Sequence, residues 1–114
     1  NDGTCIRDFI HIMDLAEAHR LILEHLEDSN PKFLNLNIGT GIGTSVINLV
    51  NTFCTVNKCH IPYQFVERRA GDSPILVADN SISKSLLNWE PRRSLSEMCF
   101  DGWQWQLNNP NGFN

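Results

Sequence analysis

Long apolar runs, basic clusters and catalytic motifs are all scarce in this sequence of 114 residues. No stretch approaches the roughly 20 apolar residues that a membrane-spanning helix needs, so we expect no membrane partner. The 9 lysines and arginines are outnumbered by 13 aspartates and glutamates, which gives a net charge of −4, and the arginines are scattered. Nucleic acid is therefore not an expected partner, because phosphate backbones are bound by basic surfaces.

The sequence contains a single tyrosine, Tyr63, and Glu67 lies four residues after it. A tyrosine general base needs a lysine at that spacing, because the ammonium lowers the pKa of the phenol. A carboxylate has the wrong charge for this role. The four histidines also lack a clear serine or cysteine partner. We therefore predict no catalytic residue in this chain.

Cysteines are few and irregularly spaced. Their even number permits disulfides, but no other feature indicates a secreted scaffold. Cys54, Cys59 and His60 lie close together, yet zinc pairs are usually spaced more tightly and need two further ligands. We expect reduced thiols in a cytoplasmic protein and no metal site.

The chain starts with NDGTCIRDF, without an initiator methionine or a signal-like region. We therefore interpret it as a piece of a longer polypeptide. Its length suits one small domain with one modest core, and no linker divides it.

Four helices are predicted from the spacing of apolar residues and from capping residues at their starts. The third is short and ends at Leu87. The predicted caps are Asp14 with Glu17, Thr44 or Ser45, Asp79, and Ser94 with Glu97.

Three strands are predicted, at residues 6–12, 33–38 and 61–66. The second is the clearest, and the third is rich in β-branched and aromatic residues. Strands and helices then alternate along the chain before a final pair of helices. This order predicts an α/β fold, with a small mixed layer of short strands and about four helices.

A glycine-rich segment, NIGTGIGTSV, links a predicted strand to a predicted helix. Gly39 and Gly41 match the first two glycines of a dinucleotide-binding loop, but Thr44 stands at the third place. Glu67 follows the next strand, somewhat farther along than the acidic residue that binds a ribose. The alternative is a glycine turn that ends at a helix cap and needs no ligand.

An arginine-rich loop, ERRAGDSP at residues 67–74, carries groups suited to a nucleotide. Arg68 and Arg69 offer planar forks for phosphate oxygens, and Asp72 offers two acceptors for paired hydroxyls. Arg7 lies beside an apolar strand, and together two distant arginines could clamp a diphosphate. The alternative is a solvated loop with internal ion pairs.

Four motifs together resemble the UDP-glucose 4-epimerases of the extended short-chain dehydrogenase/reductase family. The first motif is specific to that family and its close relatives, and the four follow the family's order along nearly the whole chain. The motifs are DGTCIRDFIHIMDLAEAH, NIGTGIGTSV, RRAGDSP and LNWEPRRSLSEMCFDGWQWQ.

The resemblance implies that residues 1–114 form the single C-terminal, UDP-sugar-binding domain of such an enzyme. In this family an N-terminal Rossmann domain, absent here, binds NAD and carries the catalytic tyrosine and lysine. The substrates would be UDP-glucose and UDP-galactose, interconverted through a 4-keto intermediate. The fragment alone would be inactive, and the complete protein would be cytoplasmic and a homodimer.

The resemblance also implies a substrate-binding role for six residues. Arg7 and Arg69 would hold the diphosphate, and Asp72 would bind the ribose hydroxyls. The other three, which would line the UDP or sugar pocket, are Phe9, Val46 and Leu76.

Two details of that pocket also follow from the resemblance. Phe9 replaces a common tyrosine and so lacks a hydroxyl. Leu76 falls where a small residue would admit N-acetylated sugars, so it favours glucose and galactose. The glycine loop is assigned to turn geometry and pocket shaping, because the family's NAD fingerprint lies upstream.

Two other functions remain open. One is a stand-alone nucleotide-binding or structural module, and the other is part of a different nucleotide-sugar epimerase or dehydratase.

Overall fold

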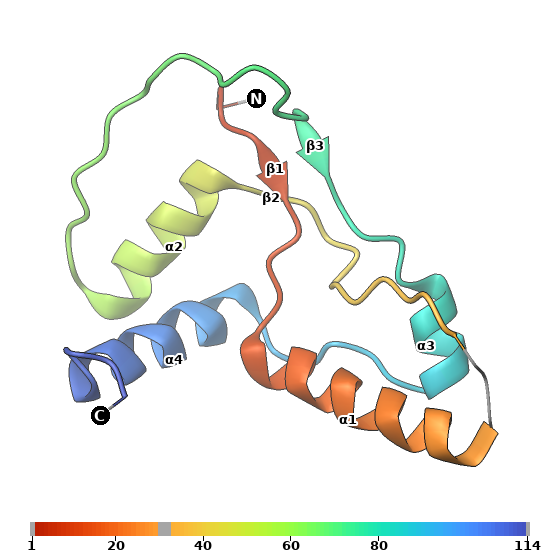
Figure 1. Cartoon of the computed structure of the whole chain (residues 1–114). Helices are drawn as coiled ribbons and strands as arrows, with labels where there is room; N and C mark the ends of the chain where they lie inside the picture. Colours follow the sequence, from red (N-terminus) through yellow and green to blue (C-terminus); the bar gives the residue numbers. More distant parts are fainter. Residues whose placement is uncertain (1, 30–32, 114) are drawn as a thin grey trace.

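The computed structural model describes residues 2–29 and 33–113, which form an open α/β arrangement (Figure 1). Four helices and three two-residue strands lie within these ranges, so the predicted fold class is confirmed. The helices are α1 (Ile12–Ser29), α2 (Val46–Asn57), α3 (Ser81–Leu87) and α4 (Leu95–Asn108). The strands are β1 (Ile6–Arg7), β2 (Thr44–Ser45) and β3 (Ile75–Leu76).

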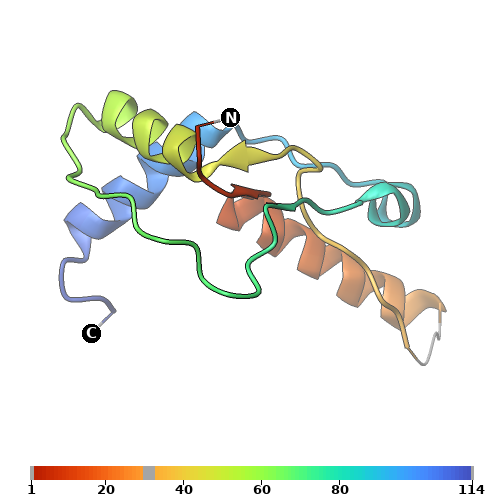
Figure 2. The same ribbon diagram turned by 90° about the horizontal axis from the view of Figure 1, so that it is seen from above.

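A small mixed sheet joins three distant parts of the chain in the order β2-β1-β3. β1 is antiparallel to β2 and parallel to β3, with Ile6 opposite both Ser45 and Ile75. Figure 2 shows β1 and β2 beside the N-terminal end of α2. The sheet therefore brings Arg7 next to the start of α2 and to the segment that follows the arginine-rich loop.

The predicted strands were mostly wrong. The first is reduced to Ile6–Arg7, and residues 33–38 and 61–66 form no strand. A strand needs hydrogen-bonding partners, and neither segment pairs with another strand in the part of the chain that the structure describes. Leu36 and Ile38 pack against the core, whereas Phe65 remains 66% exposed. The apolar pattern therefore predicted burial correctly for Leu36 and Ile38 but not for Phe65, and it identified no partner strand for either segment.

The predicted cap of the first helix was also wrong. α1 begins at Ile12, and the His11 ring accepts a hydrogen bond from the Met13 amide at 3.0 Å. Asp14 is fully buried and accepts hydrogen bonds from the backbone amides of Arg92 and Arg93. The carboxylate therefore ties α1 to the segment before α4 instead of capping its own helix.

The remaining caps agree with the sequence to within one residue. Ser45 caps α2, and Ser94 with Glu97 forms the predicted capping box of α4. The cap position of α3 is Asn80, one residue after the predicted Asp79, whose carboxylate still accepts the Ser81 amide at 3.0 Å.

Side chains pack in two small regions, one where α1 contacts α3 and the other where α2 contacts α4. Ala18, Leu87 and Trp89 form a buried cluster where α1 meets α3. α2 packs on α4, where the rings of Phe53 and Trp103 meet edge to face at 5.7 Å. The radius of gyration is 16.8 Å, compared with about 13 Å for a compact domain of this length. Many apolar side chains therefore remain exposed.

No helix in residues 2–29 or 33–113 combines the length and apolarity needed to cross a bilayer.

Candidate functional site

A cavity of about 730 Å³, here called the arginine cavity, opens where the start of the chain meets the arginine-rich loop. β1 supplies one wall, the first residue of α2 another, and the loop the third. Five of the six residues predicted to bind substrate line it: Arg7, Phe9, Val46, Arg69 and Asp72. The short sheet produces this gathering, because β1 pairs both with β2, which leads into α2, and with β3, which follows the loop.

The Asp72 carboxylate lies between the two predicted arginines. Its Oδ1 is 3.9 Å from Nη2 of Arg7, and its Oδ2 is 3.3 Å from Nε of Arg69. The side chains of Arg7 and Asp72 are about a quarter exposed, whereas that of Arg69 is 88% exposed. Two cations from opposite parts of the sequence therefore meet at one carboxylate on the cavity wall.

Arg7 is held more firmly than Arg69. Its Nη1 donates to the Ile6 carbonyl at 2.8 Å and to the Ser73 carbonyl at 2.9 Å. These bonds fix one side of the guanidinium against the backbone and leave Nη2 toward Asp72. Arg7 is thus a preorganised cation, and Arg69 is an adjustable one.

Two cavity residues with suitable chemistry, Arg68 and Phe65, are not among the six predicted site residues, although the sequence had already indicated Arg68 as a possible phosphate ligand. Arg68 also lines the cavity, and its Nη2 lies 4.0 Å from the Cys5 sulfur. Phe65 adds an exposed aromatic ring, in edge contact with Tyr63 at 5.8 Å. Both lie in or beside the arginine-rich loop. The paired arginine and the aromatic pattern of residues 61–66 were signals that could have identified them.

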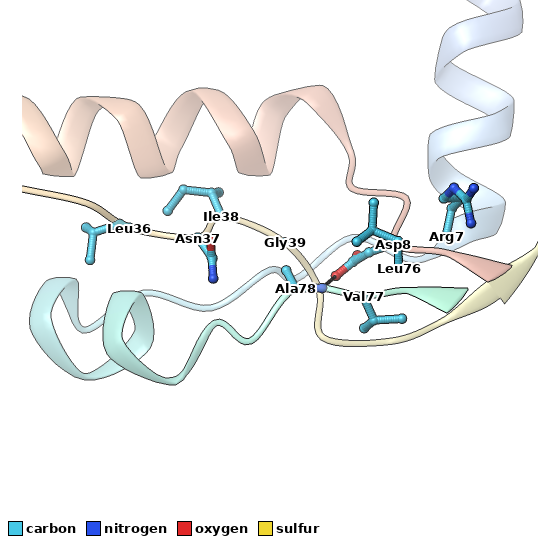
Figure 3. A pocket seen from close by; sticks show the side chains of 9 residues that line it. All are labelled: Arg7, Asp8, Leu36, Asn37, Ile38, Gly39, Leu76, Val77 and Ala78. Atoms are coloured by element: carbon cyan, nitrogen blue, oxygen red, sulfur yellow. Dashed lines mark hydrogen bonds between the residues drawn. The ribbon is translucent and has the colours of Figure 1, made fainter. Parts of the chain in front are cut away.

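Leu76, the sixth predicted residue, lines an adjacent cavity of about 470 Å³ together with Arg7 (Figure 3). Arg7 belongs to both cavities, so they adjoin at its side chain. Leu76 is 63% exposed. The structure therefore places Leu76 beside the arginine cavity and not in its wall.

The carboxylate of Asp8, the residue that directly follows β1, holds the glycine loop through hydrogen bonds. Asp8 accepts the amides of Thr40 and Gly41, each at 2.9 Å, and the amide of Ala78 at 3.3 Å. Figure 3 shows Asp8 pointing toward Ala78. Burial acts to raise the pKa of Asp8, but a hydrogen bond from the Thr40 hydroxyl and those from the three amides outweigh it and leave the pKa below its ordinary value.

This arrangement does not fit a dinucleotide phosphate. The amides that would cradle a phosphate already donate to Asp8, and the loop therefore presents an occupied anion position. Gly39 serves close packing, since an added Cβ would lie 2.6 Å from Cβ of Ala78 and 2.7 Å from Asp8 Oδ2. The amides of Thr40 and Gly41 are therefore not free to hold an NAD phosphate. Gly41 serves turn geometry with a φ of +74°, whereas Gly39 serves close packing.

His11 has a structural role in this fold. The ring is 3% exposed, and its Nδ1 accepts a hydrogen bond from the Met13 amide, so Nε2 donates to Asp101 at 3.1 Å.

Tyr63 is 56% exposed and packs against Phe65. The four cysteines are free.

The fold defines the chain as an α/β unit of the extended short-chain dehydrogenase/reductase type. It superimposes with a TM-score of 0.88 on a UDP-glucose 4-epimerase from Stenotrophomonas maltophila, solved with NAD and a formylated UDP-arabinopyranose. The two are 41% identical, over 95% of this chain and 32% of that one. A Bifidobacterium longum UDP-glucose 4-epimerase, solved with NAD+ and UDP, matches with a TM-score of 0.84 and 33% identity, over 98% of this chain and 33% of that one.

The chain belongs to the family described as GDP-mannose 4,6 dehydratase, whose family model matches residues 1–101. Among curated relatives, the UDP-glucose 4-epimerase of Bacillus subtilis (strain 168) is 45% identical over 112 residues, 98% of this chain and 33% of the relative. That of Drosophila melanogaster is 40% identical over 114 residues, 99% of this chain and 33% of the relative. The chain thus spans about a third of the length of the curated relatives it matches.

Proposed function

We propose that this chain is the C-terminal, UDP-sugar-binding part of a UDP-glucose 4-epimerase. The observation that carries the proposal is the convergence of Arg7 and Arg69 on one carboxylate in the wall of the arginine cavity. A diphosphate presents several anionic oxygens, and two guanidinium forks suit it well. The same cavity offers Asp72 as acceptor for the hydroxyls of a ribose, and the apolar side chains of Phe9 and Val46.

In the complete protein, this chain would bind the substrate and the remainder would bind NAD. In the proposed reaction, NAD held by the complete protein would supply reversible hydride transfer at C4 of the hexose through a 4-keto sugar, and the family's catalytic tyrosine, also outside this chain, would take and return the proton of the C4 hydroxyl. The residues of this chain would bind and orient the UDP-sugar while the remainder of the complete protein holds NAD. Leu76, beside the hexose, would limit the room for an N-acetyl group and favour UDP-glucose and UDP-galactose. We also propose that the complete protein is cytoplasmic, acts in galactose metabolism and forms a homodimer.

UDP binding by the chain tests the proposal. Calorimetric titration of UDP should show binding, and Arg69→Ala should weaken it by about 1.5–3 kcal/mol, because one charge-assisted contact to the diphosphate is lost. Arg20→Ala is the matched control. It removes the same charge from an exposed position on α1, where Arg20 pairs with Glu24 away from the cavity. Equal UDP affinity in Arg69→Ala and the native chain would remove Arg69 from the site.

A further inference from the structure

Asp72 occupies the position between the arginines that a bound anion would need. Each of its carboxylate oxygens faces a different guanidinium, at 3.9 Å from Arg7 and 3.3 Å from Arg69. The loop supports this placement, because Gly71 turns the chain at a φ of +87° and the Asp72 amide donates to the Arg69 carbonyl at 3.3 Å. An incoming diphosphate must therefore compete with a carboxylate that belongs to the protein.

We propose that Asp72 is an internal competitor that makes the arginine cavity reject bare diphosphates and select diphosphates that carry a ribose. The inference rests on the proposed function and concerns the specificity of the same site. Pyrophosphate would have to separate Asp72 from both arginines, and it would then lie beside an uncompensated negative charge. A ribose attached to the diphosphate changes this balance. Its hydroxyls can donate to the displaced carboxylate and so replace the lost arginine contacts.

The surrounding contacts show which partner would move. Arg7 stays in place because two backbone carbonyls hold its Nη1. The Arg69 side chain is 88% exposed and has no comparable anchor in the part of the chain that the structure describes. When a ligand displaces the Asp72 carboxylate, Arg7 would therefore stay in place, and the Arg69 side chain would move with the ligand.

The test compares pyrophosphate with UDP by isothermal titration calorimetry on the native chain and three variants. Asp72→Asn should bind pyrophosphate about tenfold more tightly, because two partly exposed ion pairs no longer compete. It should bind UDP no more tightly than the native chain, so the preference for UDP falls. Asp72→Ser removes the same charge with a shorter side chain and should give the same gain. Thermal melting of each variant checks that the fold is retained.

Glu27→Gln is the matched control, because it removes the same charge from an exposed position on α1 that does not line the arginine cavity. Its pyrophosphate affinity should stay within about twofold of the native value. An equal gain in Glu27→Gln would reduce the effect to net charge and overturn the inference. Unchanged pyrophosphate affinity in both Asp72 variants, with UDP binding by the native chain intact, would overturn the inference alone. Absence of UDP binding by the native chain would overturn both the inference and the proposed function.

Discussion

Asp14 shows how much one buried side chain contributes to this open fold. It is fully buried on α1, yet it accepts the amides of Arg92 at 3.1 Å and Arg93 at 2.9 Å and pairs with the Arg93 guanidinium. Burial acts to raise the pKa of Asp14, but the hydrogen bonds from Arg93 and Arg92 outweigh it and leave the pKa below its ordinary value. The ionised carboxylate therefore stabilises the folded chain.

Asp14→Ala should lower the free energy of unfolding by about 3 kcal/mol, because it leaves buried donors without an acceptor. Glu17→Ala is the control. The sequence paired Glu17 with Asp14 in a capping box that the structure does not contain, so this change should cost less than about 0.5 kcal/mol. Urea unfolding at pH 7 measures both variants, and equal losses would favour the capping box.

The pH dependence of the Asp14 effect gives a second measurement. The folded pKa lies below the unfolded value, so the contribution is complete above the unfolded pKa of about 3.9 and is lost as pH falls through the lowered folded pKa. The difference in stability between the native chain and Asp14→Ala should therefore shrink below about pH 4. A constant difference down to pH 2 would contradict this assignment.

Gly39 is a position where only a missing side chain permits the observed packing. A Cβ there would lie 2.6 Å from Cβ of Ala78 and 2.7 Å from Asp8 Oδ2. Gly39→Ala should therefore destabilise the chain by about 1–3 kcal/mol through overpacking. Gly102→Ala, on α4 where the added Cβ would meet nothing within 4 Å apart from its chain neighbours and the helix's own backbone, should instead stabilise it by about 0.5–1 kcal/mol. Thermal melting distinguishes the two, and a neutral Gly39→Ala would show that Asp8 and Ala78 adjust freely.

At the scale of elements, the helices carry their own start signals and the strands do not. The capping box of α4 is complete: Glu97 Oε2 accepts the Ser94 amide at 2.7 Å, and Ser94 Oγ accepts the Glu97 amide at 3.2 Å. These contacts lie within four consecutive residues, so the sequence alone could predict them. Hydrogen bonds from the Ser94 backbone and side chain also hold the pKa of Glu97 below its ordinary value.

Ser94→Ala should cost about 1 kcal/mol of stability, because the helix loses its side-chain cap. Ser96→Ala, two residues later on an exposed position of the same helix, should be neutral or slightly stabilising, since alanine has the higher helix propensity. Chemical denaturation followed by circular dichroism compares the two. Similar losses for both would mean that the cap contributes little.

At the scale of the whole molecule, the open shape limits what the chain can do by itself. Only four apolar residues are buried among those described, while side chains such as Phe33, Val66 and Ile12 are more than 60% exposed. The glycine loop does not fit a dinucleotide phosphate, and the arginine cavity contains binding groups without a tyrosine–lysine pair. We therefore expect this chain to bind the nucleotide without catalysing the reaction.

The chain supplied with UDP-galactose and NAD should form no UDP-glucose, even under conditions where it shows the UDP binding that we propose. The physical reason is that hydride transfer needs NAD held against C4 of the sugar, and the loop amides here already donate to Asp8. Chromatography of the nucleotide sugars measures the conversion, with an intact UDP-glucose 4-epimerase as positive control. Measurable conversion by the chain alone would refute the proposed division of roles.

The sequence by itself determined the helices and most of their caps, because turn periodicity and capping act between residues a few positions apart. It also identified Arg7, Arg69 and Asp72 as groups with the right chemistry for a nucleotide diphosphate. Tertiary structure alone decided that these three meet in one cavity with Phe9 and Val46, and that Leu76, the sixth predicted residue, lies in the cavity beside it. It also decided which segments of the chain pair with one another as strands. Both outcomes depend on contacts between distant parts of the chain, and no local pattern encodes which partner will be present.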